Sequence, residues 1–144
     1  MGRRDGIAMQ FNWPVRVYYE DTDAGGVVYH SQYLNYMERA RTEWLRNLGI
    51  AQSTMRNELA VVFVVRKMQI QFHKPAKFDD ALIVKTSLSE RNGASLNFLQ
   101  TIARDDEMLI SAIVEVVCVD EKKFKPVRIP ASLLARLDSI PLSN

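Results

Sequence analysis

The sequence has little of several features that mark special classes of protein. It contains a single cysteine, Cys118, in an apolar run, so we expect a small buried side chain in a reducing compartment rather than a disulfide. No apolar stretch approaches the ~18 residues that a membrane-spanning helix needs. No apolar segment follows the arginines of residues 1–8, as it would in a secretory signal. By elimination, we expect a cytoplasmic protein.

An excess of charge of one sign is also lacking. The 19 basic and 17 acidic residues leave a net charge of +2, which is too small to indicate nucleic-acid binding by itself. A short basic group between Lys122 and Arg128 is interpreted as ordinary solvated surface, with a phosphate-binding patch as the alternative. At 144 residues, with 47% apolar and 25% charged residues, the chain has the size and composition of one globular domain. Residues 1–10 are polar and aperiodic, so we expect a loose leader.

One long amphipathic helix dominates the predicted secondary structure. Apolar residues recur at helical spacing between Tyr33 and Leu48, with Leu34 and Leu45 widening the row. Gly49 follows directly and suits a left-handed C-terminal cap. Strands are predicted at 13–19, 60–72, 81–90, 96–102 and 108–119, and short helices at 52–59 and 131–137.

Tight turns at Asn92-Gly93 and Asp105-Asp106 join the later strands. The pattern predicts an α+β fold, in which an antiparallel meander wraps its dry face around the long helix. Several strands are apolar on both faces, and a second subunit could bury the outer one. We therefore expect a homo-oligomer with a site near the subunit boundary.

The loop before the helix carries the residues with chemical potential. Gly25 and Gly26 are expected where the chain enters the helix, so that a ligand can approach free backbone N–H groups closely. A carboxylate beside such donors, from Asp21 or Asp23, is typical of a hydrolytic site with oxyanion stabilisation. The alternative is a turn or cap role. Too few further oxygen ligands are present for a metal site, and the two glycines lack the spacing of a nucleotide-binding loop.

These residues also resemble a known family. The segment 17–30, Val-Tyr-Tyr-Glu-Asp-Thr-Asp-Ala-Gly-Gly-Val-Val-Tyr-His, with Glu-Arg-Ala-Arg at 38–41, resembles the signature of hotdog-fold thioesterases of the 4-hydroxybenzoyl-CoA thioesterase class. It is especially similar to the Tol-Pal-associated acyl-CoA thioesterases, the YbgC family. The resemblance extends from Trp13 to about Leu137 and includes the segments 63–68 and 116–120.

The resemblance implies a hotdog fold, an antiparallel sheet wrapped around one long central helix, in agreement with the pattern above. It implies an enzyme of lipid metabolism that hydrolyses acyl-CoA or acyl carrier protein thioesters, with no cofactor beyond the CoA of the substrate. It further implies a dimer or a dimer of dimers, and peripheral association with membrane-lipid enzymes.

The resemblance also assigns roles to single residues. The catalytic carboxylate corresponds to Asp23, not Asp21, and acts either as a nucleophile that forms a mixed anhydride or as a general base that activates water. His30 would polarise the thioester or handle a proton, through its ring or its backbone N–H. Tyr19 corresponds to a site tyrosine, although a strand tyrosine is ordinarily a packing residue. Glu38 is the rival carboxylate, because some hotdog enzymes carry theirs on the central helix.

The CoA or carrier-protein end of the substrate has weaker candidates. Arg91 and Ser95, which flank Asn92-Gly93, and the pair Arg66-Lys67 could contact it, or could be ordinary turn and surface residues. Two other functions are possible for the fold. One is a non-hydrolytic scaffold that binds acyl-CoA or carrier protein, and the other is a dehydratase. The dehydratase requires a histidine in a different sequence setting, which the chain lacks.

Overall fold

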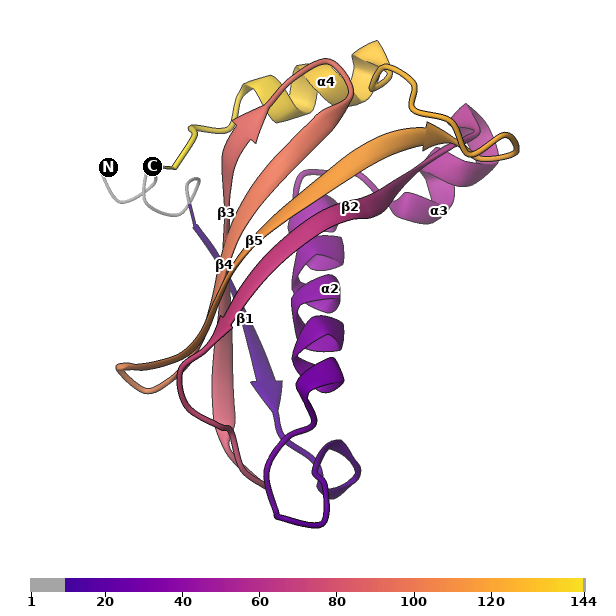
Figure 1. The fold of residues 1–144 in the computed structure, drawn as a ribbon. Helices are drawn as coiled ribbons and strands as arrows, with labels where there is room; N and C mark the ends of the chain where they lie inside the picture. The colour runs from indigo at the N-terminus through magenta and orange to yellow at the C-terminus, as the bar shows by residue number, and fades with distance from the viewer. Residues whose placement is uncertain (1–9, 144) are drawn as a thin grey trace.

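A computed structural model describes residues 10–143 of the chain (Figure 1). Five antiparallel strands form one sheet in the order β1-β3-β4-β5-β2. Their bounds are Phe11–Arg16 for β1, Val61–Phe72 for β2, Ala81–Arg91 for β3, Ser95–Arg104 for β4 and Glu107–Asp120 for β5. The helices are α2 at His30–Asn47, α3 at Gln52–Thr54, which continues into a π-helical turn at Met55–Leu59, and α4 at Ala131–Asp138.

The sheet curves around α2, which lies against its concave face (Figure 1). This confirms the predicted α+β arrangement of a wrapped antiparallel sheet and a central helix. The expected leader at 1–10 falls almost wholly outside the described residues. None of the helices within residues 10–143 is both long enough and apolar enough to cross a membrane.

The buried face of α2 forms the centre of the core. Its fully buried side chains follow the predicted helical spacing and include Tyr33, Met37, Ala40 and Trp44. The ring of Trp44 packs edge-on against Phe98 of β4, with 5.1 Å between ring centroids. Because the apolar row runs through four turns, the helix is held along most of its length by packing against the sheet.

Leu34 departs from the predicted apolar row. Its side chain remains 39% exposed, because it faces an open groove between α2 and the strands rather than the closed core. The row predicted from periodicity is therefore right for the face that meets the sheet and too wide on the side of Leu34.

The C-terminal end of α2 confirms the predicted glycine cap. Gly49 has φ of +82°, a backbone conformation that glycine adopts at little cost. Its N–H donates to the carbonyl of Arg46, and the N–H of Ile50 donates to the carbonyl of Leu45, both at 2.9 Å. This pair of bonds is a Schellman motif, and it orients the chain toward α3.

The first strand is shorter than predicted. β1 ends at Arg16, and Tyr19 begins a 3₁₀ turn at Tyr19–Asp21 instead of ending the strand. The backbone of Val17 still exchanges hydrogen bonds with the turn at Asp79 and Asp80, at 2.9 and 3.0 Å. Alternating apolar residues continued the strand pattern beyond the point where the chain leaves the sheet.

The predicted turn at Asn92 is confirmed, and a side chain holds it. The Asn92 Oδ1 atom accepts the backbone N–H groups of Ala94 and Ser95 at 3.0 and 2.9 Å. β3 and β4 pair from Arg91 and Leu96 onward, with a shift in register between Leu88 and Glu90. Their hairpin lies beside α4, at the far end of α2 from the loop that precedes the helix (Figure 1).

Candidate active site

The acidic loop folds into a small hairpin before α2. Asp23 donates its N–H to the carbonyl of Val27 at 2.8 Å and accepts the N–H of Gly26 on its own carbonyl at 3.0 Å. Gly26 has φ of +84°, as expected for the last position of a three-residue hairpin loop. The pattern of Asp followed three residues later by Gly therefore has a direct structural cause.

The two acidic side chains of this loop have different environments. The carboxylate of Asp21 is buried, and its Oδ2 accepts the backbone N–H of Tyr18 at 2.9 Å and the hydroxyl of Tyr36 at 2.8 Å. Burial, together with this bond to a carboxylate, raises the pKa of Tyr36 well above its ordinary value. Asp21 therefore ties the loop to α2 and is committed to a structural contact.

Asp23 is half-exposed and contacts only backbone donors through one of its oxygens. Its Oδ1 accepts the N–H of Gly25 at 2.8 Å and that of Val27 at 3.3 Å. Among residues 10–143, no hydrogen bond reaches Oδ2. The hairpin thus fixes the carboxylate through one oxygen and leaves the other open to a reactant.

The structure differs from the expected location of Gly25 and Gly26 at the helix entry. They form the hairpin loop, α2 starts at His30, and both glycine N–H groups are already bonded to Asp23. At the helix start itself, the N–H groups of His30 and Ser31 have no acceptor among the described residues. The free donors therefore come from α2, whereas a direct role of the glycines in substrate binding stays a prediction.

His30 lies over a small cavity at this end of α2. The cavity has a volume of about 180 Å³ and is also lined by Val27, Tyr33, Phe72 and His73. The His30 ring lies 4.7 Å from the Phe72 ring. Asp23 does not line the cavity, but its carboxylate accepts the backbone N–H of Val27, and Val27 does line it.

His73 was not singled out from the sequence. It is the second of the two histidines in the chain, and its Nε2 lies 2.9 Å from the hydroxyl oxygen of Ser111. A histidine at the end of a strand, just before Pro75, was the available signal. Both imidazoles meet at one cavity only because β2 ends beside the start of α2, which is a tertiary relation.

Two further predicted residues are not brought together with Asp23. Tyr19 is 78% exposed and packs edge-on against Phe78, with 5.6 Å between ring centroids. Glu38 lies two turns along α2 from His30, in the wall of a different cavity. Within one chain, neither residue shares the cavity beneath His30.

Arg91 and Ser95 lie at the far end of α2 from the acidic loop (Figure 1). The Arg91 guanidinium donates to the carbonyl oxygens of Ile140 and Asp138 at 2.8 and 3.1 Å. Ser95 is buried and its hydroxyl donates to Asn92 at 3.0 Å. Arg91 therefore holds the C-terminal segment against the sheet, and Ser95 stabilises the turn. Structural roles of this kind were the alternative to a role in binding CoA.

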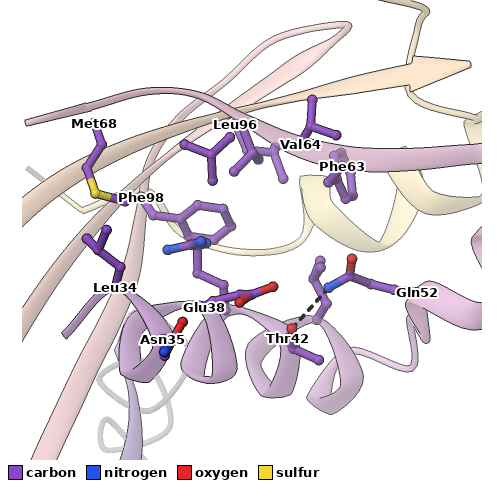
Figure 2. A pocket seen from close by; sticks show the side chains of 14 residues that line it. Leu34, Asn35, Glu38, Thr42, Gln52, Phe63, Val64, Met68, Leu96 and Phe98 are labelled. Carbon is purple, nitrogen blue, oxygen red and sulfur yellow. Dashed lines mark hydrogen bonds between the residues drawn. The ribbon is translucent and has the colours of Figure 1, made fainter. Parts of the chain in front are cut away.

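A larger groove runs along α2 on the side of Leu34. Its volume is about 590 Å³, and its walls come from α2 and from strands β2, β4 and β5 (Figure 2). Among the residues that the structure describes, no three His, Cys, Asp or Glu side chains lie close enough together to hold a metal ion. The groups available for chemistry at the start of α2 are therefore a carboxylate, imidazoles and the positive end of a helix, and the larger groove has a size that small ligands occupy.

Comparisons with known proteins agree with this arrangement. Residues 17–137 match the thioesterase-like superfamily. The chain is 51% identical over 125 residues to the acyl-CoA thioesterase YbgC of Haemophilus influenzae, covering 87% of this chain and 92% of that protein. It is 50% identical over 126 residues to the acyl-CoA thioester hydrolase YbgC of Escherichia coli, covering 87% and 93%.

Solved structures show the same fold. A probable thioesterase from Bartonella henselae superposes with a TM-score of 0.81 at 38% identity, covering 84% of this chain and 99% of that one. A protein from Thermus thermophilus gives a TM-score of 0.87 at 29% identity, covering 94% and 100%. The predicted hotdog fold and the predicted resemblance to YbgC are confirmed. This chain belongs to the thioesterase-like superfamily.

Proposed function

We propose that this chain hydrolyses the thioester bond of acyl-CoA, with the Asp23 carboxylate and the start of α2 acting on the same acyl carbon. The observation that carries the proposal is the Asp23 hairpin directly before a helix whose first N–H groups are unused. The identity of about half to acyl-CoA thioesterases supports this choice of substrate.

Each group has a role that its surroundings favour. In one route, Asp23 Oδ2 attacks the thioester carbon, the C–S bond breaks to release the thiolate, and water then hydrolyses the mixed anhydride to the free acid and the carboxylate. In the other, Oδ2 accepts a proton from a water molecule that attacks the same carbon. Oδ1 keeps the carboxylate in place through its bonds to Gly25 and Val27. The N–H groups of His30 and Ser31 hold the carbonyl oxygen as it gains negative charge, aided by the helix dipole. The His30 ring is available to protonate the leaving thiolate.

We propose that the chain assembles with further copies of itself through an edge of its sheet. β1 and β2 are the two edges of the sheet, and Val65 on β2 and Ile113 on β5 are among its exposed apolar side chains. A second copy of the chain could cover them and complete the site, as a dimer or dimer of dimers. The thiol Cys118 is buried and free, which suits the cytoplasm. The alternative substrate is an acyl group carried by acyl carrier protein. In that case the chain would associate peripherally with enzymes of membrane-lipid metabolism.

The proposal is tested by Asp23→Asn, assayed by thiol release from a panel of acyl-CoAs. The amide can still accept the Gly25 and Val27 N–H groups, so the hairpin should hold and the melting temperature should stay the same. It can act neither as nucleophile nor as base, so kcat/KM should fall by roughly 10²–10⁴-fold. Full activity in this variant would remove Asp23 from the mechanism.

The matched control is Asp21→Asn, two residues away. It weakens the buried bond to Tyr36, so it should lower the free energy of unfolding by about 1 kcal/mol while activity is retained. If the wild-type chain binds acyl-CoA tightly and releases no thiol, the non-hydrolytic scaffold is the better assignment.

A further inference from the structure

The polar side chains around the cavity at the start of α2 differ in how far they are committed to other contacts. The Lys74 ammonium is bonded to the Glu107 carboxylate, and the His73 Nε2 atom lies 2.9 Å from the Ser111 hydroxyl oxygen. Tyr33 lines the same cavity and is only 2% exposed. Among the described residues that line the cavity, it carries the only polar side chain that is buried.

The hydroxyl of Tyr33 is engaged as an acceptor and not as a donor. Its oxygen accepts the backbone N–H of Ala76 at 2.9 Å, and within residues 10–143 no hydrogen bond runs from this hydroxyl to an acceptor. A phenol has one proton to donate, so the proton of Tyr33 is available to a molecule in the cavity. Burial raises the pKa of Tyr33 above its ordinary value, so the hydroxyl keeps its proton at neutral pH.

The neighbours of Ala76 place this hydroxyl at the cavity wall. Pro75, which precedes Ala76, lines the cavity, and so does Val28, whose N–H donates to the Ala76 carbonyl at 2.9 Å. The hydroxyl of Tyr33 is thus fixed to a segment that is itself bonded to the loop before α2. A donor held in this way is oriented before any ligand arrives.

Tyr36, one turn further along α2, uses its hydroxyl in the opposite way. It is fully buried and donates its proton to the Asp21 carboxylate at 2.8 Å, and it does not line the cavity. The rings of Tyr33 and Tyr36 pack edge-on, with 6.3 Å between centroids. Two adjacent buried tyrosines therefore differ in one respect, because the proton of Tyr36 is bonded within the protein and that of Tyr33 is not.

The cavity also lies beside the helix start to which the proposed function assigns the thioester. His30 precedes Tyr33 by three positions, so the two side chains share a face of α2, and both line the cavity. Its volume of about 180 Å³ is below that of sites that enclose a whole ligand. It has room for a compact group that accepts a hydrogen bond, and under the proposed function that group is the thioester.

We propose that Tyr33 is a further catalytic residue, whose hydroxyl donates a hydrogen bond to the thioester carbonyl oxygen beside the N–H groups of His30 and Ser31. The inference rests on the proposed function and adds a side-chain donor to it. The carbonyl oxygen gains negative charge when its carbon is attacked, so a donor already in place stabilises the transition state more than the substrate. The proton stays on Tyr33 throughout.

Tyr33→Phe tests the proposal, because it keeps the ring and removes only the hydroxyl. In thiol-release assays with the acyl-CoA panel, kcat should fall by roughly 10–100-fold while KM changes less than about twofold, since the lost bond acts mainly in the transition state. The melting temperature should fall by about 3 °C, because the Ala76 N–H loses its acceptor.

Tyr36→Phe is the matched control. It removes a buried hydroxyl from the neighbouring turn of α2 and breaks the bond to Asp21, so the melting temperature should fall by a similar amount while kcat is retained. A second measurement uses a thioether analogue of acyl-CoA, which lacks the carbonyl oxygen. Its Kd should be the same for the wild type and for Tyr33→Phe.

Several results would overturn the inference. An unchanged kcat in Tyr33→Phe, or an equal loss of kcat in Tyr36→Phe, would reduce the hydroxyl to a structural contact. Weaker binding of the thioether by Tyr33→Phe would mean that the hydroxyl shapes the cavity, and a Tyr33→Phe chain that fails to fold would assign it to the fold. Absence of thiol release by the wild type would instead overturn the proposed function, which an active Tyr33→Phe variant would leave standing.

Discussion

The two ends of α2 are built in opposite ways. At the C-terminal end, Gly49 and Ile50 satisfy the last carbonyls, and Arg136 donates to the carbonyl of Leu48 at 3.0 Å. At the N-terminal end, Tyr29 occupies the N-cap position but its side chain makes no capping hydrogen bond, and the first turn contains no acidic residue. Helix N-termini generally favour a capping side chain or a carboxylate in the first turn.

The difference teaches where the molecule keeps free hydrogen-bonding capacity. An uncapped N-terminus presents N–H groups and about half a positive charge, and it attracts a ligand oxygen of negative character. A Schellman-capped C-terminus presents nothing of the kind. Under the proposed function, the C-terminal end of the helix contributes stability and the N-terminal end contributes the groups that act on the substrate. The variants below test this difference between the two ends of α2, from the largest expected effect to the smallest.

Gly49→Ala should destabilise the C-terminal end of α2 and leave the N-terminal end unchanged. Alanine disfavours the left-handed φ of +82°, and its Cβ would meet the Arg136 guanidinium, which must then give up the Leu48 carbonyl. We expect a loss of about 2 kcal/mol in the free energy of unfolding, measured by denaturant titration. The kcat/KM at a temperature where the variant stays folded should match the wild type. A specific loss of activity would mean that the two ends are coupled.

Tyr29→Ser should supply the missing side-chain cap at the N-terminal end of α2. The backbone of Tyr29 is extended, with φ of −60° and ψ of 144°, as the N-cap position requires, and a serine hydroxyl there accepts an N–H of the first turn. The variant should gain about 1 kcal/mol of stability and lose at least about tenfold in kcat/KM, since the hydroxyl competes for the donors that hold the thioester oxygen.

Tyr29→Ala is the matched variant for that experiment. It removes the exposed ring without supplying a cap, so it should show neither the stabilisation nor the same loss of activity. If Tyr29→Ser is more stable and fully active, the N–H groups at the start of α2 are not part of the mechanism.

Periodicity and turn chemistry predicted most of the fold. The helical row from Tyr33 to Trp44 and the glycine at position 49 are local patterns with local causes, and the structure repeats them. The family motif also marked Asp23, which the structure places in the small hairpin before α2, and His30, which is the first residue of α2. The error at Tyr19 arose because alternation continued past the end of the sheet.

Other parts of the site could not be predicted, because they depend on contacts between distant segments. Asp21 and Tyr36 are separated by fifteen positions, and nothing in the local spacing distinguishes the buried Asp21 from the half-exposed Asp23. The helical pattern gives no sign that Arg41 is buried, but in the structure it is buried and donates to Gln100, 59 positions away. Buried polar partners of this kind are set by strand order, not by spacing along the chain.

The smallest expected effect concerns an ion network near the N-terminal end of α2, where Arg104 bonds to Asp80 and Glu107, and Lys74 bonds to Glu107. The bonds from Lys74 and then from Arg104 lower the pKa of Glu107 to about 2, from an ordinary value of 4.5. Between these two pH values the unfolded chain binds more protons, so the contribution of Glu107 is complete above about pH 4.5 and is lost as pH falls toward 2.

Glu107→Gln should therefore flatten the dependence of stability on pH in this window: the variant should melt at a slightly lower temperature than the wild type at neutral pH, because exposed ion pairs contribute little, and at about the same temperature as the wild type near pH 2. Melting curves at several pH values between 2 and 7 measure the slope. Asp106→Asn, on the same turn and without an ion-pair partner among the described residues, should keep the wild-type slope. Parallel slopes for the wild type and Glu107→Gln would mean that the network does not hold the strands around the N-terminal end of α2, which would leave the Asp21–Tyr36 bond as the principal polar tie there.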